Sequence, residues 1–255
     1  MNLSQQGKKY RQEIKLLLTW ADYLVTRGRL RALLMSDEHA GPIGDYWIRS
    51  LYLDDVKASA YWEKITGASD RKKYRIRIYD GSDAVIKLEC KEKHGSCIRK
   101  RSTSISRDTC ESLIQGDYSV LAQYEDPLCH EVLSMANRNG LSPSVVVDYD
   151  REAYVYPVSN VRLTFDKNLH AAVESSDIFD LDMMSLPVFP DQSVILEVKY
   201  DEFLPRYLAD IVSNTRGTKI ALSKFCLCRD CLRAVKPQYC FETKGIEPCK
   251  QLKVF

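Results

Sequence analysis

Charged and apolar residues alternate along several short stretches of the chain. In residues 85–93, VIKLECKEK, charged side chains occupy every second position from Lys87 onward, and Ile86, Leu88 and Cys90 occupy the positions between them. Because successive side chains of a β-strand point to opposite faces, this spacing predicts a strand with one charged face and one apolar face.

The same period of two predicts nine strands. They cover residues 10–17, 46–55, 72–80, 84–93, 98–106, 144–156, 161–169, 193–201 and 218–227. So many strands with few helices between them predict an α+β protein with an antiparallel sheet, either open or closed into a barrel. No repeat, low-complexity segment or linker divides the chain, which predicts a single domain over residues 1–255.

Helical spacing of apolar residues predicts three helices, at residues 19–34, 126–140 and 204–214. Thr19 and Asp126 are placed as N-caps of the first two. The residues expected to face the core are Trp20, Leu24, Leu30, Leu33 and Leu34 in the first helix, Leu128, Val132 and Met135 in the second, and Leu204, Tyr207, Leu208 and Ile211 in the third.

The composition narrows the class of protein without naming a partner. The 255 residues are 45% hydrophobic and 28% charged, with a net charge of +2, as in ordinary globular proteins. No run approaches the roughly 20 apolar residues of a membrane span, and the N-terminus lacks the apolar core of a secretory signal. We therefore expect a cytoplasmic protein without a membrane span of its own.

Nine cysteines are irregularly spaced, which favours a reducing compartment over a disulfide framework. Five of them lie near the C-terminus, at Cys226, Cys228, Cys231, Cys240 and Cys249. Their spacing matches no common zinc-ligand pattern and no histidine follows. We interpret them as reduced thiols, with a zinc site as the alternative.

The charged faces of the predicted strands are rich in basic residues, although the whole chain is nearly neutral. The residues on these faces are Arg11, Glu13 and Lys15; Lys73, Arg75 and Arg77; Lys87, Glu89 and Lys91; Arg162, Thr164 and Asp166; and Glu197 and Lys199. An open sheet would turn these faces to solvent. A closed sheet would instead line a lumen with them, with helices covering the apolar faces.

A charged lumen must stay wet or hold a counter-ion, because desolvating an unpaired charge costs several kcal/mol. The basic excess favours a polyanion. Carboxylates among the bases would repel that anion unless they hold a divalent cation, and Mg²⁺ or Mn²⁺ takes carboxylate and phosphate oxygens together.

Seven motifs, in this order, carry a family resemblance: IRSLYLDD, YWEKITGASDRKKYRIRIYD, IKLECKEK, DYDREAYV, RLTFD, LEVKYDEFLP and SKF. The chain resembles the VTC polyphosphate polymerase domain, a branch of the CYTH-like triphosphate tunnel metalloenzymes. The resemblance covers about residues 10–225 and leaves residues 226–255 as a cysteine-containing extension. It implies an antiparallel tunnel barrel with a charged lumen and helices packed outside.

The resemblance also implies an activity, namely transfer of the terminal phosphate of ATP to a growing inorganic polyphosphate chain with Mn²⁺ or Mg²⁺. It assigns catalytic roles to Arg75, Arg77, Lys91, Arg162 and Glu197, and substrate binding to Arg11, Lys15, Lys87, Tyr149, Arg151, Lys199, Ser223 and Lys224. Glu197 corresponds to the family's metal-binding glutamate. We expect Glu13 or Glu89 to assist it; the alternative for Glu89, which sits between Lys87 and Lys91, is a role as an internal ion-pair partner only.

Two features of the first strand depart from related patterns. Leu16 stands where this family usually has tyrosine, and we expect it to face outward. The hydrolase and cyclase branches of the superfamily usually open with two glutamates flanking one residue; Arg11 replaces the first of these, which favours the polymerase.

Two alternative functions stay open. One is an inorganic triphosphatase or polyphosphate hydrolase of the same superfamily, and the other is a non-catalytic module that binds polyphosphate or nucleotides. Nucleic acid is not expected as a partner, because aromatic residues are not interleaved with the bases. Translocation of a product would require a membrane-protein partner.

Overall fold

The computed structural model describes residues 12–38, 41, 44–95, 97–172, 176–221 and 223–235. Within these residues, eleven strands form one antiparallel sheet in the order β11-β1-β10-β8-β7-β3-β4-β5-β6, with β2 added to β7 and β9 added to β8. The strands are β1 (Gln12–Leu18), β2 (Met35–Ser36), β3 (Asp45–Asp54), β4 (Arg71–Tyr79), β5 (Ser82–His94), β6 (Cys97–Ser104), β7 (Ser142–Tyr156), β8 (Val161–Ala172), β9 (Ser185–Pro187), β10 (Val194–Tyr200) and β11 (Thr218–Lys219).

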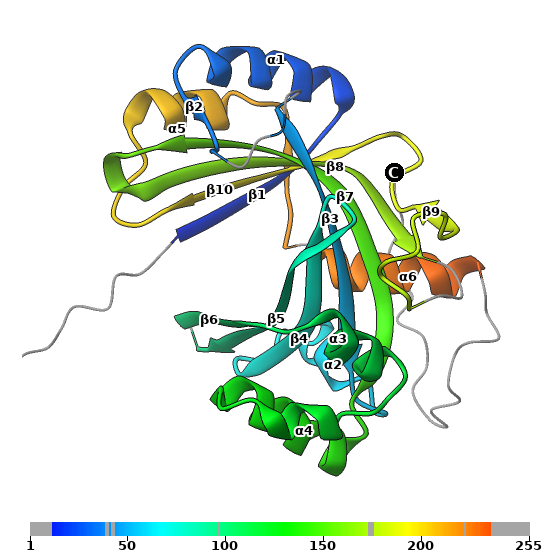
Figure 1. Ribbon diagram of the computed structural model, residues 1–255. Coiled ribbons are helices and arrows are strands. Elements are labelled where there is room, and N and C mark those ends of the chain that lie inside the picture. Colours follow the sequence, from blue (N-terminus) through cyan, green and yellow to red (C-terminus); the bar gives the residue numbers. More distant parts are fainter. Residues whose placement is uncertain are drawn as a thin grey trace, which may run out of the picture.

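The sheet curls around a concave interior, as Figure 1 shows. Strands β1, β10 and β8 form one wall, β4, β5 and β6 form the facing wall, and the long strands β3 and β7 connect them. The path of hydrogen-bonded strands begins at β11 and ends at β6, so strand pairing among the described residues does not close the curled barrel. The predicted α+β class and antiparallel barrel architecture are confirmed, with an open seam.

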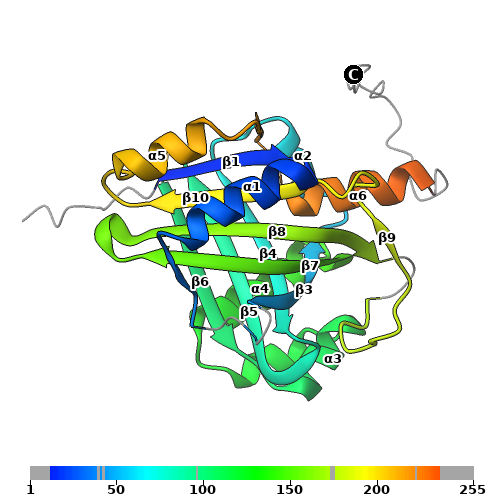
Figure 2. The ribbon, with the colours of Figure 1, turned by 90° about the horizontal axis from the view of Figure 1, so that it is seen from above.

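Helices cover the outer faces of both walls. The helices are α1 (Trp20–Arg31), α2 (Ser59–Ile65), α3 (Arg107–Ile114), α4 (Pro127–Asn139), α5 (Arg206–Ser213) and α6 (Lys224–Val235), with short 3-10 turns at Ser119–Gln123 and Val158–Asn160. Figure 2 shows α1 and α5 lying over β1, β10 and β8. Helices α3 and α4 cover the opposite wall. No helix in the described ranges is both long enough and apolar enough to cross a membrane.

The apolar faces of the strands form the core beneath these helices. On β4 and β5, Ile76, Ile78 and Leu88 are buried against Leu113 of α3 and Val132 of α4. A second cluster joins the outer faces of β1, β8 and β10 to α1 and α5. Alternation thus places the apolar side chains outward under the helices and leaves the charged side chains to the concave face. Leu16 is buried in the second cluster, as its predicted outward orientation requires.

Helix α6 packs differently from the others. Its Phe225 joins a buried cluster with Val147, Tyr149 and Ile195. Val147 and Tyr149 share a face of β7 with Arg151, and Ile195 lies on the Glu197 face of β10. We call the concave interior of the curled sheet the bore. Helix α6 therefore packs against the inner face of the sheet at one end of the bore.

The sequence prediction was wrong about residues 218–227 and missed two short helices. Residues 218–227 form a strand only at Thr218–Lys219, and α6 begins at Lys224. The predicted strand stopped at residue 227, before Cys228 and Leu232. It therefore missed that Phe225, Cys228 and Leu232 recur at helical spacing. Helices α2 and α3, each of seven or eight residues, were not predicted.

Helix α1 was predicted, but only part of its predicted inward face is buried. It buries Tyr23, Thr26 and Leu30, whereas Trp20 is 40% exposed and Leu24 is 50% exposed. Polar bonds explain the difference, because the Tyr23 hydroxyl donates to Glu152 and the Thr26 hydroxyl bonds with that of Thr215. Leu33 and, in α5, Tyr207 are also exposed, while Leu34 and Leu208 are buried as predicted.

Candidate functional site

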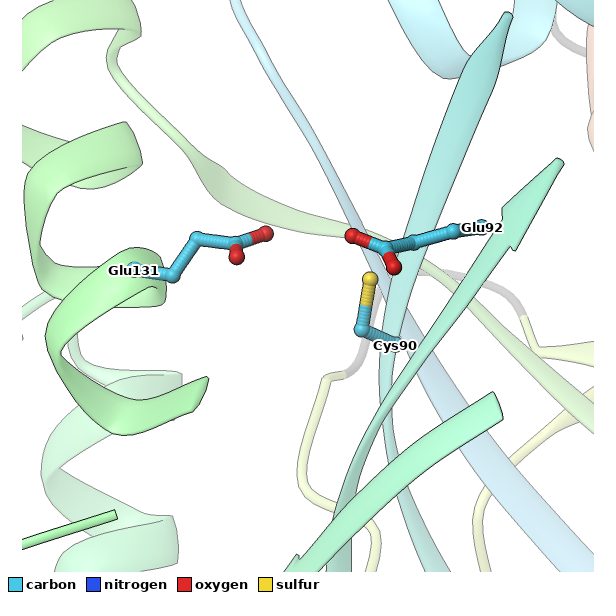
Figure 3. Close-up of side chains that lie close together, drawn as sticks. All are labelled: Cys90, Glu92 and Glu131. Atoms are coloured by element: carbon cyan, nitrogen blue, oxygen red, sulfur yellow. The ribbon is translucent and has the colours of Figure 1, made fainter. Parts of the chain in front are cut away.

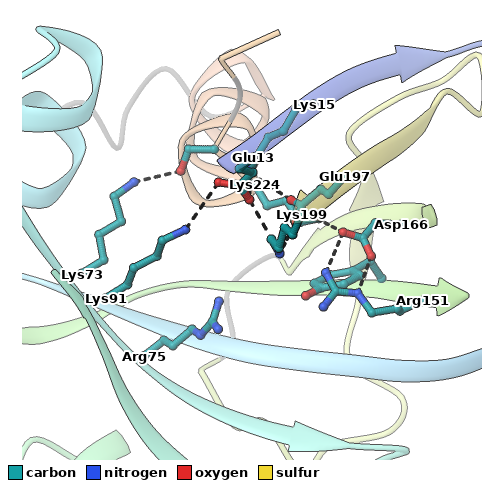
Figure 4. A network of polar contacts seen from close by, with 12 residues as sticks. Glu13, Lys15, Lys73, Arg75, Lys91, Arg151, Asp166, Glu197, Lys199 and Lys224 are labelled. Carbon is teal, nitrogen blue, oxygen red and sulfur yellow. Dashed lines mark hydrogen bonds and ion pairs between the residues drawn. The ribbon is translucent and has the colours of Figure 1, made fainter. Parts of the chain in front are cut away.

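Charged side chains from six strands and from α6 meet on the concave face. Figure 4 shows side chains of the two facing walls pointing toward one another. The residues labelled there are Glu13, Lys15, Lys73, Arg75, Lys91, Arg151, Asp166, Glu197, Lys199 and Lys224. Each strand turns its charged side chains toward the concave face because residues i and i+2 share a face.

Glu197 lies among three lysines. Its Oε1 accepts from Nζ of Lys15 at 2.9 Å and from Nζ of Lys224 at 3.2 Å, and its Oε2 accepts from Nζ of Lys199 at 2.8 Å. The glutamate is 5% exposed. Burial opposes its ionisation, but Lys224, Lys15 and Lys199 hold its pKa well below the ordinary value. Three lysines therefore compensate the single negative charge of Glu197.

Asp166 forms the second carboxylate centre of this wall. Arg151 donates to it from two nitrogens, at 2.6 and 2.8 Å, and Nζ of Lys224 lies 2.5 Å from Oδ2. Burial opposes ionisation of Asp166, and Arg151 and Lys224 lower its pKa. Lys224 thus bridges Asp166 and Glu197, and despite burial the two carboxylates raise its pKa.

On the facing wall, the two predicted arginines have different partners. Arg75 donates from Nε to Glu89 Oε2 at 2.7 Å and from a terminal nitrogen to the Tyr52 hydroxyl at 3.0 Å. Arg77 donates to two uncharged oxygens, Oγ of Ser50 at 3.0 Å and the hydroxyl of Tyr149 at 3.1 Å. Tyr149, on the connecting strand β7, therefore orients a base of the β4–β5 wall.

Glu89 behaves as the ion-pair partner that one reading of the sequence anticipated. It is 2% exposed, and Lys100 Nζ lies 2.5 Å from its other oxygen. Burial opposes its ionisation, but Arg75, Arg77 and Lys100 lower its pKa to about 2. Both oxygens of Glu89 are therefore held by cations of its own wall.

Several lysines of the β4–β5 wall are weakly compensated. Lys73 donates to Oγ of Ser223 at 2.9 Å, Lys87 donates to Oγ of Ser104 at 2.7 Å, and Lys91 lies 4.0 Å from Glu13. Desolvation by the surrounding walls lowers the pKa of Lys73 and of Lys91. The cost of holding these charges in the bore would be offset by an anion.

The remaining predicted residues lie on β8, at the start of α6 or outside the described chain. Arg162 shares a strand face with Asp166, but it donates to the Tyr46 hydroxyl at 3.1 Å and pairs with Asp37 at 2.9 Å. Ser223 and Lys224 lie at the start of α6. Arg11 lies outside the described residues.

The sequence reading missed Asp166 and Lys73 as members of the site. Both lie on faces that alternation had already marked as charged: Asp166 is two positions beyond Thr164, and Lys73 is two before Arg75. The strand period was therefore a sufficient signal for both residues.

Glu13 and Glu197 offer the oxygen ligands that a hard divalent cation prefers. They lie on neighbouring strands, where Glu13 pairs in register with Lys199 and Lys15 pairs with Glu197. Oε1 of Glu13 is buried and lacks a hydrogen bond, with lysine nitrogens at 3.5 and 3.6 Å. A buried carboxylate oxygen without a hydrogen-bond donor fits a cation ligand. Both oxygens of Glu197 already accept from lysines, so a divalent cation could bind Glu13 and Glu197 together only by displacing lysine contacts.

A second acidic group lies on the outer face, between β5 and α4. Possible ligand atoms of Cys90, Glu92 and Glu131 lie within 4.8 Å of one another, as Figure 3 shows. Arg101 already donates to Glu92 at 2.6 Å and to Glu131 at 2.7 Å, and burial raises the pKa of the Cys90 thiol to about 11. The group could hold a metal ion, but its present contacts join α4 to the sheet.

The cysteines of α6 take part in packing. Cys226 and Cys228 are buried, and the Cys228 and Cys231 thiols lie 3.6 and 3.8 Å from the carbonyl oxygens of His170 and Pro187. Within the described ranges these sulfurs do not join a metal-binding group. Cys240 and Cys249 lie outside the described residues.

Comparison with known proteins gives one family model and a set of solved structures with similar folds. The family model described as the VTC domain matches residues 10–233. A protein of Bacillus halodurans, provisionally described as an adenylate cyclase, has a similar fold with a TM-score of 0.50 and 11% identity, over 84% of this chain and 95% of that one. The Schizosaccharomyces pombe Mediator head module aligns with a TM-score of 0.42 and 8% identity, over 91% of this chain and 96% of that one. No curated protein sequence matches.

Proposed function

The chain belongs to the VTC domain family, and from this membership we propose that it transfers the terminal phosphate of ATP to a growing inorganic polyphosphate chain inside the bore. The observation that carries the proposal is the unequal compensation of charge between the walls. Lys73, Lys91 and Arg77 face the bore with hydroxyl groups or a distant carboxylate as partners. These bases can bind phosphate oxygens without first breaking a close ion pair.

The β4–β5 wall is suited to gripping the phosphates. Arginine presents a planar fork that matches two phosphate oxygens, and lysine adds a mobile point charge. Arg75 and Arg77 are two residues apart on one face of β4, and Lys87 and Lys91 project from the adjacent strand β5. A chain of phosphates along this wall would exchange hydroxyl partners for charge-assisted hydrogen bonds.

The β1–β10–β8 wall is suited to organising the transfer. Asp166 fixes Arg151 and Lys224 by three contacts, so these cations are held in place before substrate arrives. Preorganised charge of this kind lowers the barrier for phosphoryl transfer, in which positioning and charge neutralisation supply most of the catalysis. A divalent cation held by Glu13 and Glu197 would add positive charge next to the transferring phosphate.

The proposed transfer consumes no water. The bond between the β,γ-bridging oxygen and the γ-phosphorus breaks, and the electron pair leaves with ADP. A terminal oxygen of the polyphosphate chain forms the new bond to that phosphorus. Hydrolysis differs only in the attacking oxygen, which would come from water.

The test is to incubate the purified protein with ATP and Mn²⁺ and to separate the products by size. We expect long phosphate polymer and ADP in amounts that depend on the metal. Free phosphate without polymer would favour a hydrolase, and unchanged ATP would favour a binding module. Either of these results would contradict the proposed polymerase.

A further inference from the structure

Helix α1 carries an apolar face that no part of the described chain covers. Its inward side buries Tyr23, Thr26 and Leu30. At about 100° per residue, the opposite side carries Ala21, Leu24, Val25, Gly28 and Ala32. Leu24 is 50% exposed and Val25 is 55% exposed. Figures 1 and 2 place α1 on the outer surface, away from the bore.

The centre of this face is open. A Cβ atom added at Gly28 would meet nothing within 4 Å. Leu24 lies one turn before Gly28 and projects from the same face. The face therefore offers both a projecting side chain and, at Gly28, a notch between side chains where the helix backbone is uncovered.

One edge of the face carries an acidic and a basic residue that could pair between two copies of the helix. On the helical wheel, Asp22 and Arg29 lie along one edge, and Trp20, Arg27 and Arg31 lie along the other. When two identical helices pack antiparallel about a two-fold axis, each edge meets the same edge of the second copy. Asp22 then lies opposite Arg29 of the second copy.

We propose that two copies of this chain associate through α1, packed antiparallel with the two-fold axis between Val25 and Thr26. This single register pairs Asp22 with Arg29 along one edge and places Trp20 against Arg31 along the other, a cation–π arrangement. In the same register Leu24 lies within about 1.5 Å, along the axis, of the level of Gly28 in the second copy. Charge, aromatic and steric complementarity coincide, and Arg27, which recurs on the second edge in both copies, is already paired with Glu152 at 2.6 Å.

A parallel pair would not be complementary. It would bring the edge with Arg29 against the edge with Arg27 and Arg31, and like charges would meet. The antiparallel pair also leaves the concave face free, because α1 covers the outer side of β1, β8 and β10. The interface is therefore independent of the proposed polymerase activity.

The test begins with the mass of the protein in solution, measured by light scattering or sedimentation over a range of concentrations. We expect a dimer of twice the 29.3 kDa chain mass. Gly28→Leu should fill the notch and weaken the dimer by about tenfold or more. It should not unfold the monomer, because leucine has the higher helix propensity. Asn137→Leu, which adds a leucine to the exposed side of α4, is the matched control and should leave the dimer unchanged.

A charge exchange tests the register. Asp22→Arg and Arg29→Asp should each weaken the dimer by placing like charges together, and the double variant should restore it. Asp22 also lies in the first turn of α1 beside Thr19, so circular dichroism must show that each variant keeps its helices. A monomeric wild type at every soluble concentration would overturn the proposal and leave the face to a different protein. A dimer that resists Gly28→Leu, or a double variant that is not restored, would overturn the proposed interface.

Discussion

Glu197→Gln is expected to abolish metal-dependent phosphate transfer. The substitution keeps the shape of the side chain but removes the charge that would hold a divalent cation with Glu13. It also releases Lys15, Lys199 and Lys224 from the carboxylate that now compensates them. We expect turnover to fall by about a thousandfold, the upper end of the loss seen on removing a group that stabilises charge in the transition state.

The same variant should separate binding from catalysis. Removing one partner of a buried ion pair is destabilising, and with Lys15 and Lys199 partly exposed we expect a loss of about 2 kcal/mol in the free energy of unfolding. Polyphosphate supplies the missing negative charge, so it should raise the melting temperature of Glu197→Gln more than that of the wild type. The control is Glu202→Gln, at an exposed position just beyond β10. Near-normal turnover of Glu197→Gln would remove this carboxylate from the site.

Arg77→Ala is expected to give the second largest loss of activity. Arg77 is 6% exposed and donates to the hydroxyls of Ser50 and Tyr149, so its fork is already oriented but its charge is not closely paired. We expect kcat/KM for ATP to fall by about a hundredfold to a thousandfold. Arg77→Lys keeps the charge but loses the planar fork, and its activity should lie between those of Arg77→Ala and the wild type.

Two measurements distinguish this effect from general damage to the sheet. Arg99→Ala removes an exposed arginine from the β6 face that alternation turns away from the bore, and it should retain full activity. Circular dichroism of Arg77→Ala should match that of the wild type. If Arg77→Ala and Arg99→Ala are equally active, phosphate does not bind along the β4 face.

The sequence could predict which side chains face the bore because alternation is a local property. Arg75, Lys91 and Glu197 each lie on a strand whose neighbouring residues are apolar, and one face of each strand had to be buried under helices. The same rule marked Asp166 and Lys73. It could not predict the ion pair between Asp166 and Lys224, because that contact joins β8 to a helix almost sixty residues later in the chain.

Two other features depended on contacts that periodicity does not contain. The inward face of α1 is set by Tyr23, whose hydroxyl finds Glu152 on a distant strand. Helix α6 packs inside one end of the bore because Phe225 meets Tyr52 and Tyr149 there. An amphipathic pattern alone does not distinguish an outer covering from an inner one.

The central claim is that phosphate chains bind on the concave face. A crystal structure of the protein with inorganic tripolyphosphate and Mn²⁺ tests it most directly. We predict phosphate groups within hydrogen-bond distance of Arg75, Arg77 and Lys91, and an anomalous manganese peak beside Glu13 and Glu197. Phosphate bound only on the outer surface, with no ligand density in the bore, would contradict the claim.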